Sequence, residues 1–148
     1  MSQQAGESGR QDFVEVRLPA NGAYLSVLRT ATAGLAARLD FTLDEIEDLR
    51  IAVDEACAIL LQQAVPEGLL TCSFRQVGDS LWVTVSAPTT DGRAPERDTF
   101  AWTVLTALAG EVEATVADEA DSGDPQYKVV SISLHKKRGA EPGQPPPQ

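Results

Sequence analysis

The stretch that follows Phe41 predicts a long amphipathic helix, and this helix constrains the fold more than any other segment. Its start is marked by a capping box, because Thr42 precedes the helix and Glu45 stands three residues later. Phe41 and Ile46 occupy the two positions of a hydrophobic staple. The helix is expected to run to about Ala64, and its core-facing stripe is formed by Leu49, Val53, Ala56 and Leu60. Such a helix needs a broad apolar surface to pack against.

The rest of the chain supplies that surface as strands. Alternating apolar residues predict strands within residues 13–18, 70–75, 81–86, 112–116 and 130–134. A helix capped by Asn21 is expected to reach about Arg38, and a third helix, Phe100–Ala109, follows a cap at Asp98 or Thr99. The order of elements predicts an α+β fold, a two-layer sandwich whose mixed, mainly antiparallel sheet carries three helices on one face.

Length and composition indicate one globular domain. The chain has 148 residues, of which 43% are hydrophobic, and we place the domain at residues 12–137. Residues 1–11 and the proline-rich residues 138–148 are expected to be disordered, and the acidic stretch 118–124 to be a loop. The formal net charge of -10 argues against nucleic acid as a direct partner, because phosphate contacts need clustered basic residues.

Neither a membrane span nor a secretion signal is visible, so we expect a cytoplasmic protein without a membrane partner. The two cysteines, Cys57 and Cys72, would then be reduced. Their spacing fits no metal motif and His135 is the only histidine, so no metal site is expected. Two interpretations of the cysteines stay open. They are small buried apolar side chains, or they form a redox pair, which requires Cα atoms within about 7 Å.

Two stretches, Leu39–Ala56 and Phe100–Ala109, carry a family resemblance. They resemble the SpoIIAB/RsbW family of anti-sigma factors, which have the GHKL ATPase fold, and in particular actinobacterial members that restrain sigma-F or sigma-B type factors. The resemblance extends over residues 12–137. It implies a protein that sequesters an RNA polymerase sigma factor, is released by an anti-anti-sigma (STAS) protein and works as a homodimer. Many members also use ATP and Mg²⁺ to phosphorylate a serine of the anti-anti-sigma protein.

The resemblance also implies roles for residues of the long helix. Glu55 matches the family's catalytic glutamate, a general base that takes a proton from water or the substrate serine. The alternative interpretation is a solvated helix glutamate. Ile59 stands where the family has a magnesium-binding asparagine, and isoleucine offers no oxygen to this hard cation. Ala87 falls near the position of the aspartate that recognises adenine.

The phosphate side of the expected nucleotide pocket is altered as well. Thr99 and Ala101 stand where the family has a glycine-rich lid, and their side chains would hinder a close backbone approach. Asp91–Gly92 is either a displaced remnant of the adenine motif or a plain turn. Three lost contacts at about 1.5 kcal/mol or more each would remove about 4 kcal/mol, roughly a thousandfold in affinity. We therefore expect a degenerate ATP site, with no cofactor, or with weakly bound ATP and Mg²⁺ as the alternative.

Three functions stay open at this point. The leading one is an anti-sigma factor that does not act as an enzyme. The second is an active ATP-dependent serine kinase of the anti-anti-sigma protein, and the third is a regulatory domain that binds neither sigma factor nor ATP. Arg29 corresponds to a first-helix arginine used at the family's sigma interface, although an exposed arginine without that role is the alternative. Trp82 is a second candidate for a partner-binding surface, because aromatic residues are enriched in interface cores.

Overall fold

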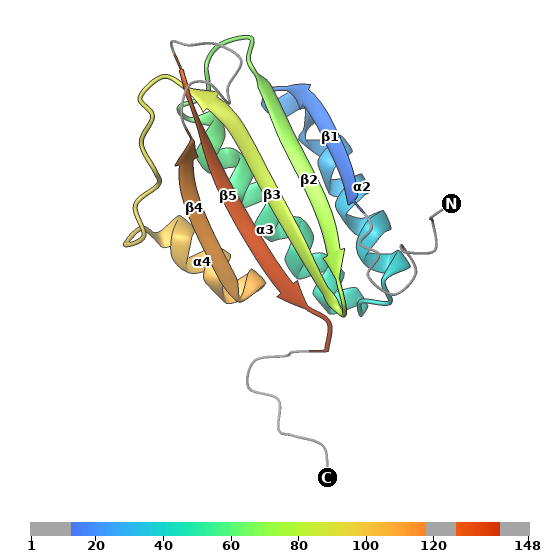
Figure 1. Ribbon diagram of the computed structural model, residues 1–148. Coiled ribbons are helices and arrows are strands. Elements are labelled where there is room, and N and C mark those ends of the chain that lie inside the picture. The colour runs from blue at the N-terminus through green and yellow to red at the C-terminus, as the bar shows by residue number, and fades with distance from the viewer. Residues whose placement is uncertain (1–12, 118–126, 140–148) are drawn as a thin grey trace, which may run out of the picture.

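The computed structural model describes residues 13–117 and 127–139. The predictions for residues 1–11, 118–124 and 140–148 lie outside the described residues. The described residues form two layers, a sheet and a layer of helices (Figure 1). The elements in order are β1 (Phe13–Pro19), the 3-10 turn η1 (Gly22–Tyr24), α2 (Leu25–Arg38), α3 (Leu43–Leu61), β2 (Leu69–Val77), β3 (Ser80–Thr89), α4 (Phe100–Ala109), β4 (Glu111–Ala117) and β5 (Lys128–Lys137).

The described strands form one sheet with the order β1-β2-β3-β5-β4. All four neighbouring pairs are antiparallel, so the expected mixed sheet is purely antiparallel in this part of the chain. The hairpin between β2 and β3 turns at Gly78, whose φ of 61° lies in the left-handed region that suits glycine. The α+β prediction is confirmed.

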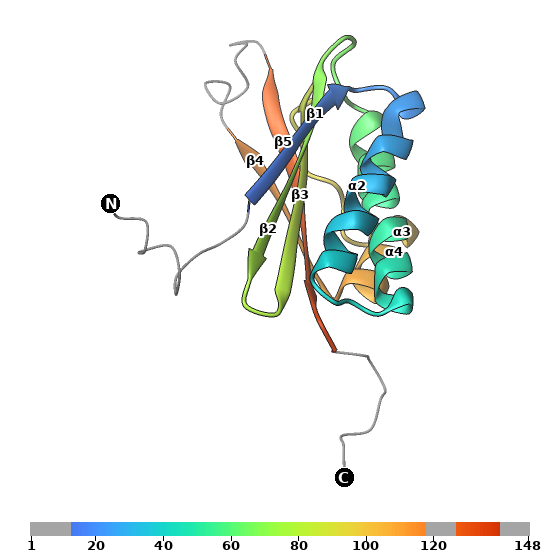
Figure 2. The ribbon, with the colours of Figure 1, turned by 90° about the vertical axis from the view of Figure 1, so that its right-hand side faces the viewer.

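The three α-helices pack on one face of the sheet (Figure 2). The predicted stripe of α3 is confirmed, because Leu49, Val53, Ala56 and Leu60 are all fully buried. The stripe shares one core with buried residues of β2, β3 and β5, the largest of which are Phe74, Leu70, Leu81, Ile132 and Leu134. No helix of the described ranges is long and apolar enough to cross a membrane.

The helix ends follow their capping residues, with two corrections. The capping box of α3 is present, since the Glu45 amide donates to Thr42 Oγ1 at 3.1 Å and the Thr42 amide donates to Glu45 Oε1 at 2.8 Å. Asn21 caps the turn η1 through the Ala23 amide, so α2 itself begins only at Leu25. The helix α3 ends at Leu61 rather than near Ala64, because residues 62–63 form a turn.

Glu45 also joins the end of β5 to the start of α3. Its Oε2 accepts a hydrogen bond from the Gly139 amide at 2.7 Å, and the residue is 2% exposed. Burial alone would raise the pKa of Glu45, but the amides of Thr42 and Gly139 and the charge of Lys136 hold the pKa below its ordinary value. The carboxylate is therefore stabilised in its charged form inside the fold.

Candidate functional site

A cavity of about 660 Å³ lies between the second half of α3, the segment that follows β3 and the start of α4. Three residues assigned to the nucleotide pocket from the sequence, Ile59, Thr99 and Ala101, line this cavity together. The other lining residues are Gln62, Gln63, Asp91, Arg93, Ala94, Pro95 and Glu96. The start of α4 is set by Thr99, whose Oγ1 accepts a hydrogen bond from the Trp102 amide at 3.2 Å.

Gln63 ties the outer wall of this cavity to the end of α3. Its side-chain Nε2 donates to the Arg93 carbonyl at 3.1 Å, and its own carbonyl accepts from the Thr90 amide at 2.9 Å. Further along, the Gly92 amide donates to Thr89 Oγ1 at 3.1 Å. These hydrogen bonds fasten the segment of residues 90–93 to the ends of α3 and β3.

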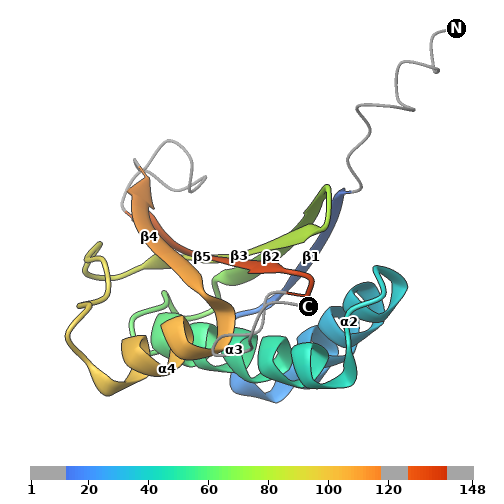
Figure 3. The ribbon, with the colours of Figure 1, turned by 90° about the horizontal axis from the view of Figure 1, so that it is seen from below.

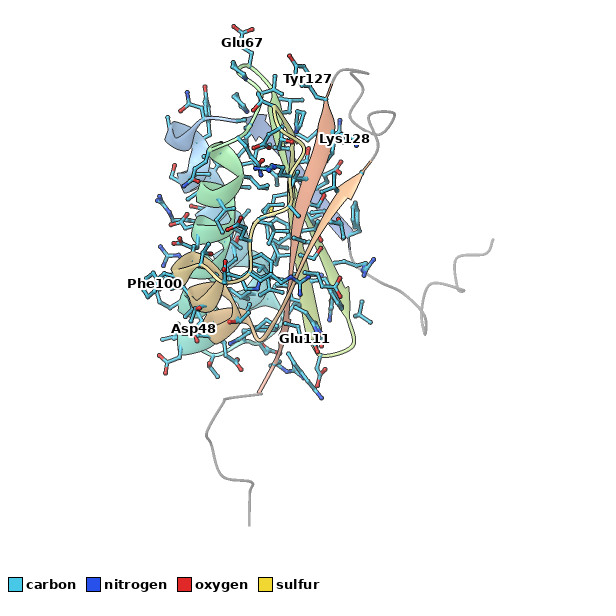
Figure 4. The ribbon with its side chains drawn as sticks, turned by 90° about the vertical axis from the view of Figure 1, so that its left-hand side faces the viewer. Asp48, Glu67, Phe100, Glu111, Tyr127 and Lys128 are labelled. Carbon is cyan, nitrogen blue, oxygen red and sulfur yellow. The ribbon has the colours of Figure 1, made fainter. Side chains whose placement is uncertain are left out.

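Asp91–Gly92 forms a turn in this wall. Gly92 has φ of 61°, and an added Cβ would lie 3.3 Å from the Lys128 side chain, which is labelled in Figure 4. The Asp91 carboxylate accepts a hydrogen bond from the Arg93 amide at 3.3 Å. The interpretation of Asp91–Gly92 as a plain turn is the one that these contacts favour.

The described cavity wall offers few groups of the kind that bind a magnesium nucleotide. Ile59 presents hydrocarbon to the cavity and supplies no oxygen ligand. The charged groups in the wall are two carboxylates, Asp91 and Glu96, and one guanidinium, Arg93, so an anionic triphosphate meets no net positive charge. Among residues 13–117 and 127–139, no three His, Cys, Asp or Glu side chains are grouped as metal ligands would be.

Two of the predicted pocket residues lie apart from the cavity. Glu55 is half-buried on α3 and is not among the lining residues, and its side chain makes no hydrogen bond or ion pair to any other described residue. Ala87 is buried in β3, opposite Val130, and lines a different cavity of about 570 Å³. Two other residues of that second cavity, Glu67 and Tyr127, mark its end of the molecule in Figure 4.

The candidate sigma-binding residue Arg29 contacts α3. Its Nε lies 2.8 Å from Asp54 Oδ2 and 3.0 Å from Oδ1, which makes a hydrogen-bonded ion pair between α2 and α3. The Arg29 side chain remains 41% exposed. Arg29 is thus neither a free exposed arginine nor a buried one, and part of its guanidinium can reach a partner.

The two cysteines are free and completely buried, Cys57 on α3 and Cys72 on β2. Burial raises the pKa of Cys57 to about 12, with a smaller contribution from the Asp54 carboxylate. Burial, together with the nearby Cys57, also raises the pKa of Cys72. These environments favour the interpretation as buried apolar side chains, and the redox pair stays a prediction.

No sequence pattern predicted two of the contacts of α3, the one between Gln63 and Arg93 and the one between Asp54 and Arg29. Gln63 stands in a Gln-Gln pair at the end of the helix, and Asp54 precedes Glu55, but neither position carries a recognisable motif.

The two tryptophans differ in exposure. Trp102 is buried, and Trp82 is half-buried on the face of the sheet opposite to its neighbours Leu81 and Val83.

Comparison with known proteins gives three informative relatives. The chain is 34% identical over 129 residues to the anti-sigma-F factor RsbW of Mycobacterium tuberculosis, a match that covers 86% of this chain and 74% of that protein. It is 40% identical over 78 residues to the serine-protein kinase RsbW of Bacillus subtilis and 37% identical over 79 residues to that of Bacillus cereus. These two matches cover 51% and 52% of this chain. No protein-family model matches the chain.

The three matches differ in extent. The chain spans about half the length of the two Bacillus relatives, 49% in each. The mycobacterial match, in contrast, extends over most of both proteins.

Proposed function

Because the chain belongs to the RsbW family of anti-sigma factors, we propose that it binds an alternative sigma factor of the sigma-F or sigma-B type and withholds it from RNA polymerase. The observation that carries the proposal is the 34% identity to an anti-sigma-F factor over 86% of this chain. We further propose that an anti-anti-sigma protein of the STAS type releases the sigma factor by competing for it.

Arg29 is the residue that we assign to the sigma interface. Its side chain is 41% exposed and its guanidinium is oriented from one side by Asp54, so little conformational freedom remains to be lost on binding. Arginine is also enriched among the residues that dominate binding energies. A carboxylate of the sigma factor is the group that such an arginine would recognise.

The wall of the 660 Å³ cavity supports sigma binding that does not depend on nucleotide. Gln63 holds the segment after β3 through its own hydrogen bonds, and Ile59 provides no ligand for Mg²⁺. We therefore assign control of the protein to competing partners and not to ATP.

A serine kinase is the second candidate. The names of the Bacillus relatives favour it, and Glu55 is retained at the position of the general base. The cavity wall argues against the kinase, because Ile59 supplies no oxygen ligand for Mg²⁺ and Asp91 and Glu96 would repel phosphate groups.

The experiment that tests the proposed function is co-purification of the full chain with each alternative sigma factor of the organism that encodes it. One sigma factor is expected to co-elute at a fixed ratio without added nucleotide, and an anti-anti-sigma protein is expected to displace it. If no sigma factor co-elutes with or without Mg-ATP, the proposal is wrong. Transfer of phosphate from ATP to the anti-anti-sigma protein would instead favour the kinase.

A further inference from the structure

The strand β4 forms one end of the sheet and has a strand neighbour on one side only. It pairs with β5 in a regular antiparallel register, from Glu111 opposite His135 to Ala117 opposite Val129, without a bulge. Among residues 13–117 and 127–139, no strand pairs with its other edge. Figure 3 shows β4 at the end of the curved sheet, with α4 in the layer of helices below it. The outer backbone groups of β4 are therefore open to one more strand.

The opposite edge strand, β1, has features that discourage an added strand, and β4 lacks them. β1 ends at Pro19, which has no amide hydrogen to donate, and its two charged side chains, Glu15 and Arg17, pair with each other at 3.2 Å. The sequence of β4 contains no proline, lysine or arginine. The only charges of β4 are those of two glutamates, which repel an acidic strand and attract a basic one. Of the two edges, β4 is thus the one suited to strand addition.

One face of β4 is acidic. Glu111, labelled in Figure 4, lies with its Oε1 2.8 Å from His135 Nδ1, and the His135 ring stacks on Trp82 with ring centroids 4.3 Å apart. These contacts position Glu111 while 72% of its side chain stays exposed. Glu113, two residues further on the same face, is exposed and makes no ion pair with a described residue. The face therefore offers two carboxylates to a positively charged neighbour.

The other face of β4 is apolar. Val112 and Ala114 are partly buried and pack against the core. Val116 continues the same row, and 40% of it is exposed. An added strand with apolar side chains beside this row would extend the core and cover Val116. The two faces of β4 together favour a strand that is basic on one face and apolar on the other.

We propose that β4 is a docking site for an extended segment of a partner protein in which basic and apolar residues alternate. Backbone hydrogen bonds along β4 supply the affinity, and the alternating side chains supply the specificity. The basic residues lie beside Glu111 and Glu113, and the apolar residues lie beside the row that ends at Val116. A second copy of this chain is a poor occupant, because it would bring its own two glutamates to the same edge.

The proposed docking site is separate from the residue assigned to sigma binding. Arg29 belongs to α2, which lies at the other end of the layer of helices in Figure 3. The inference therefore goes beyond the proposed function, and its test does not involve a sigma factor. Failure of the docking site would leave the result of the sigma co-purification unaffected.

Binding of a synthetic peptide to the full chain tests the proposal. The probe is the fluorescein-labelled peptide Lys-Val-Lys-Val-Lys-Val-Lys, which has the length of β4. The reference peptide, Lys-Lys-Lys-Lys-Val-Val-Val, has the same composition and charge but does not alternate. In fluorescence anisotropy at about 0.15 M salt, the alternating peptide should bind with a dissociation constant below about 1 mM and at least tenfold more tightly than the reference. No binding, or equal binding of both peptides, would overturn the proposal.

Charge reversal on β4 tests the position of the site. Glu113→Lys should weaken binding of the alternating basic peptide at least tenfold, and should permit binding of Glu-Val-Glu-Val-Glu-Val-Glu. Glu47→Lys is the matched control, because it makes the same charge change on the exposed surface of α3 and should leave the affinity nearly unchanged. Melting temperatures verify that both variants are folded. A Glu113→Lys variant that binds the basic peptide as tightly as the wild type does would contradict the site.

Amide NMR spectra of the wild-type chain locate the bound peptide without any substitution. The largest shifts on addition of the alternating peptide should fall on residues 111–117 and on their neighbours in β5. Shifts concentrated on the helices or on β1 would overturn the proposal.

Discussion

Arg29 of α2 and Asp54 of α3 form an ion pair across 25 positions of sequence, and Asp54 directly precedes Glu55. The pair links the helix assigned to sigma binding with the helix that resembles the nucleotide-site helix. Because both side chains are more than one third exposed, the pair itself contributes little stability, below about 1 kcal/mol. Its effect is to fix the direction of the guanidinium.

Arg29→Ala should therefore weaken sigma binding while hardly changing the melting temperature. We expect the dissociation constant for the sigma factor to rise at least tenfold, which corresponds to about 1.4 kcal/mol. Arg29→Glu would be a less specific test, because that variant places a carboxylate beside Asp54 and should also lower the melting temperature. Arg50→Ala, which removes another half-exposed arginine, is the control, and calorimetry measures both. If Arg29→Ala binds the sigma factor as tightly as the wild type does, Arg29 is not part of the interface.

Both cysteines should resist thiol reagents in the folded protein. With a Cys57 pKa of about 12, roughly one thiol in ten thousand is ionised at pH 8, and the side chain is also inaccessible. A chromogenic disulfide reagent at pH 8 should release no signal within minutes, and two equivalents per chain in denaturant. Rapid reaction of the native protein, or a Cys57–Cys72 disulfide under mild oxidant, would favour the redox pair.

Glu45→Gln should destabilise the protein in a manner that depends on pH. The pKa of Glu45 is lowered in the folded state, so its charge contributes stability above the unfolded pKa, near 4.3, and this contribution disappears as pH falls through the folded pKa. The variant should lose about 1–3 kcal/mol at pH 7, and the difference from wild type should shrink below about pH 4. Denaturant melts at both pH values measure this difference. A difference that does not vary with pH would contradict the assigned charge.

Mg-ATP should bind weakly or not at all, and Ile59→Asn alone should not create a tight site. The substitution supplies one oxygen ligand, but Asp91, Glu96 and the segment held by Gln63 remain in the wall. Isothermal calorimetry with ATP and Mg²⁺ measures this in both proteins. A wild-type dissociation constant below about 10 µM, equivalent to about -7 kcal/mol, would contradict the degenerate pocket.

Local signals made much of this fold predictable. The capping box at Thr42 and the stripe of α3 depend on residues within a few turns of each other. The alternation of apolar and polar residues assigned the strand side chains to the correct faces of the sheet, with Trp82 and Leu81 on opposite faces. The resemblance placed Ile59, Thr99 and Ala101 in one group, and all three line one cavity.

The remaining features depend on contacts between distant segments. The hydrogen bond from Gln63 to Arg93 spans 30 positions and the Arg29–Asp54 pair spans 25, so periodicity carries no signal for either. The stacking of Trp82 on His135 requires the register of β3 and β5, and a shift of one residue would turn either ring to the other face of the sheet. Ala87 was assigned from its position in the sequence, but its side chain is buried in the sheet.

Binding of the cognate sigma factor, measured with and without Mg-ATP, tests the central claim most directly. We predict a complex whose dissociation constant is the same within about twofold in both conditions, since Gln63 and its partners hold the cavity wall without nucleotide. Absence of binding to every alternative sigma factor, or binding that appears only with Mg-ATP, would contradict a nucleotide-independent anti-sigma factor.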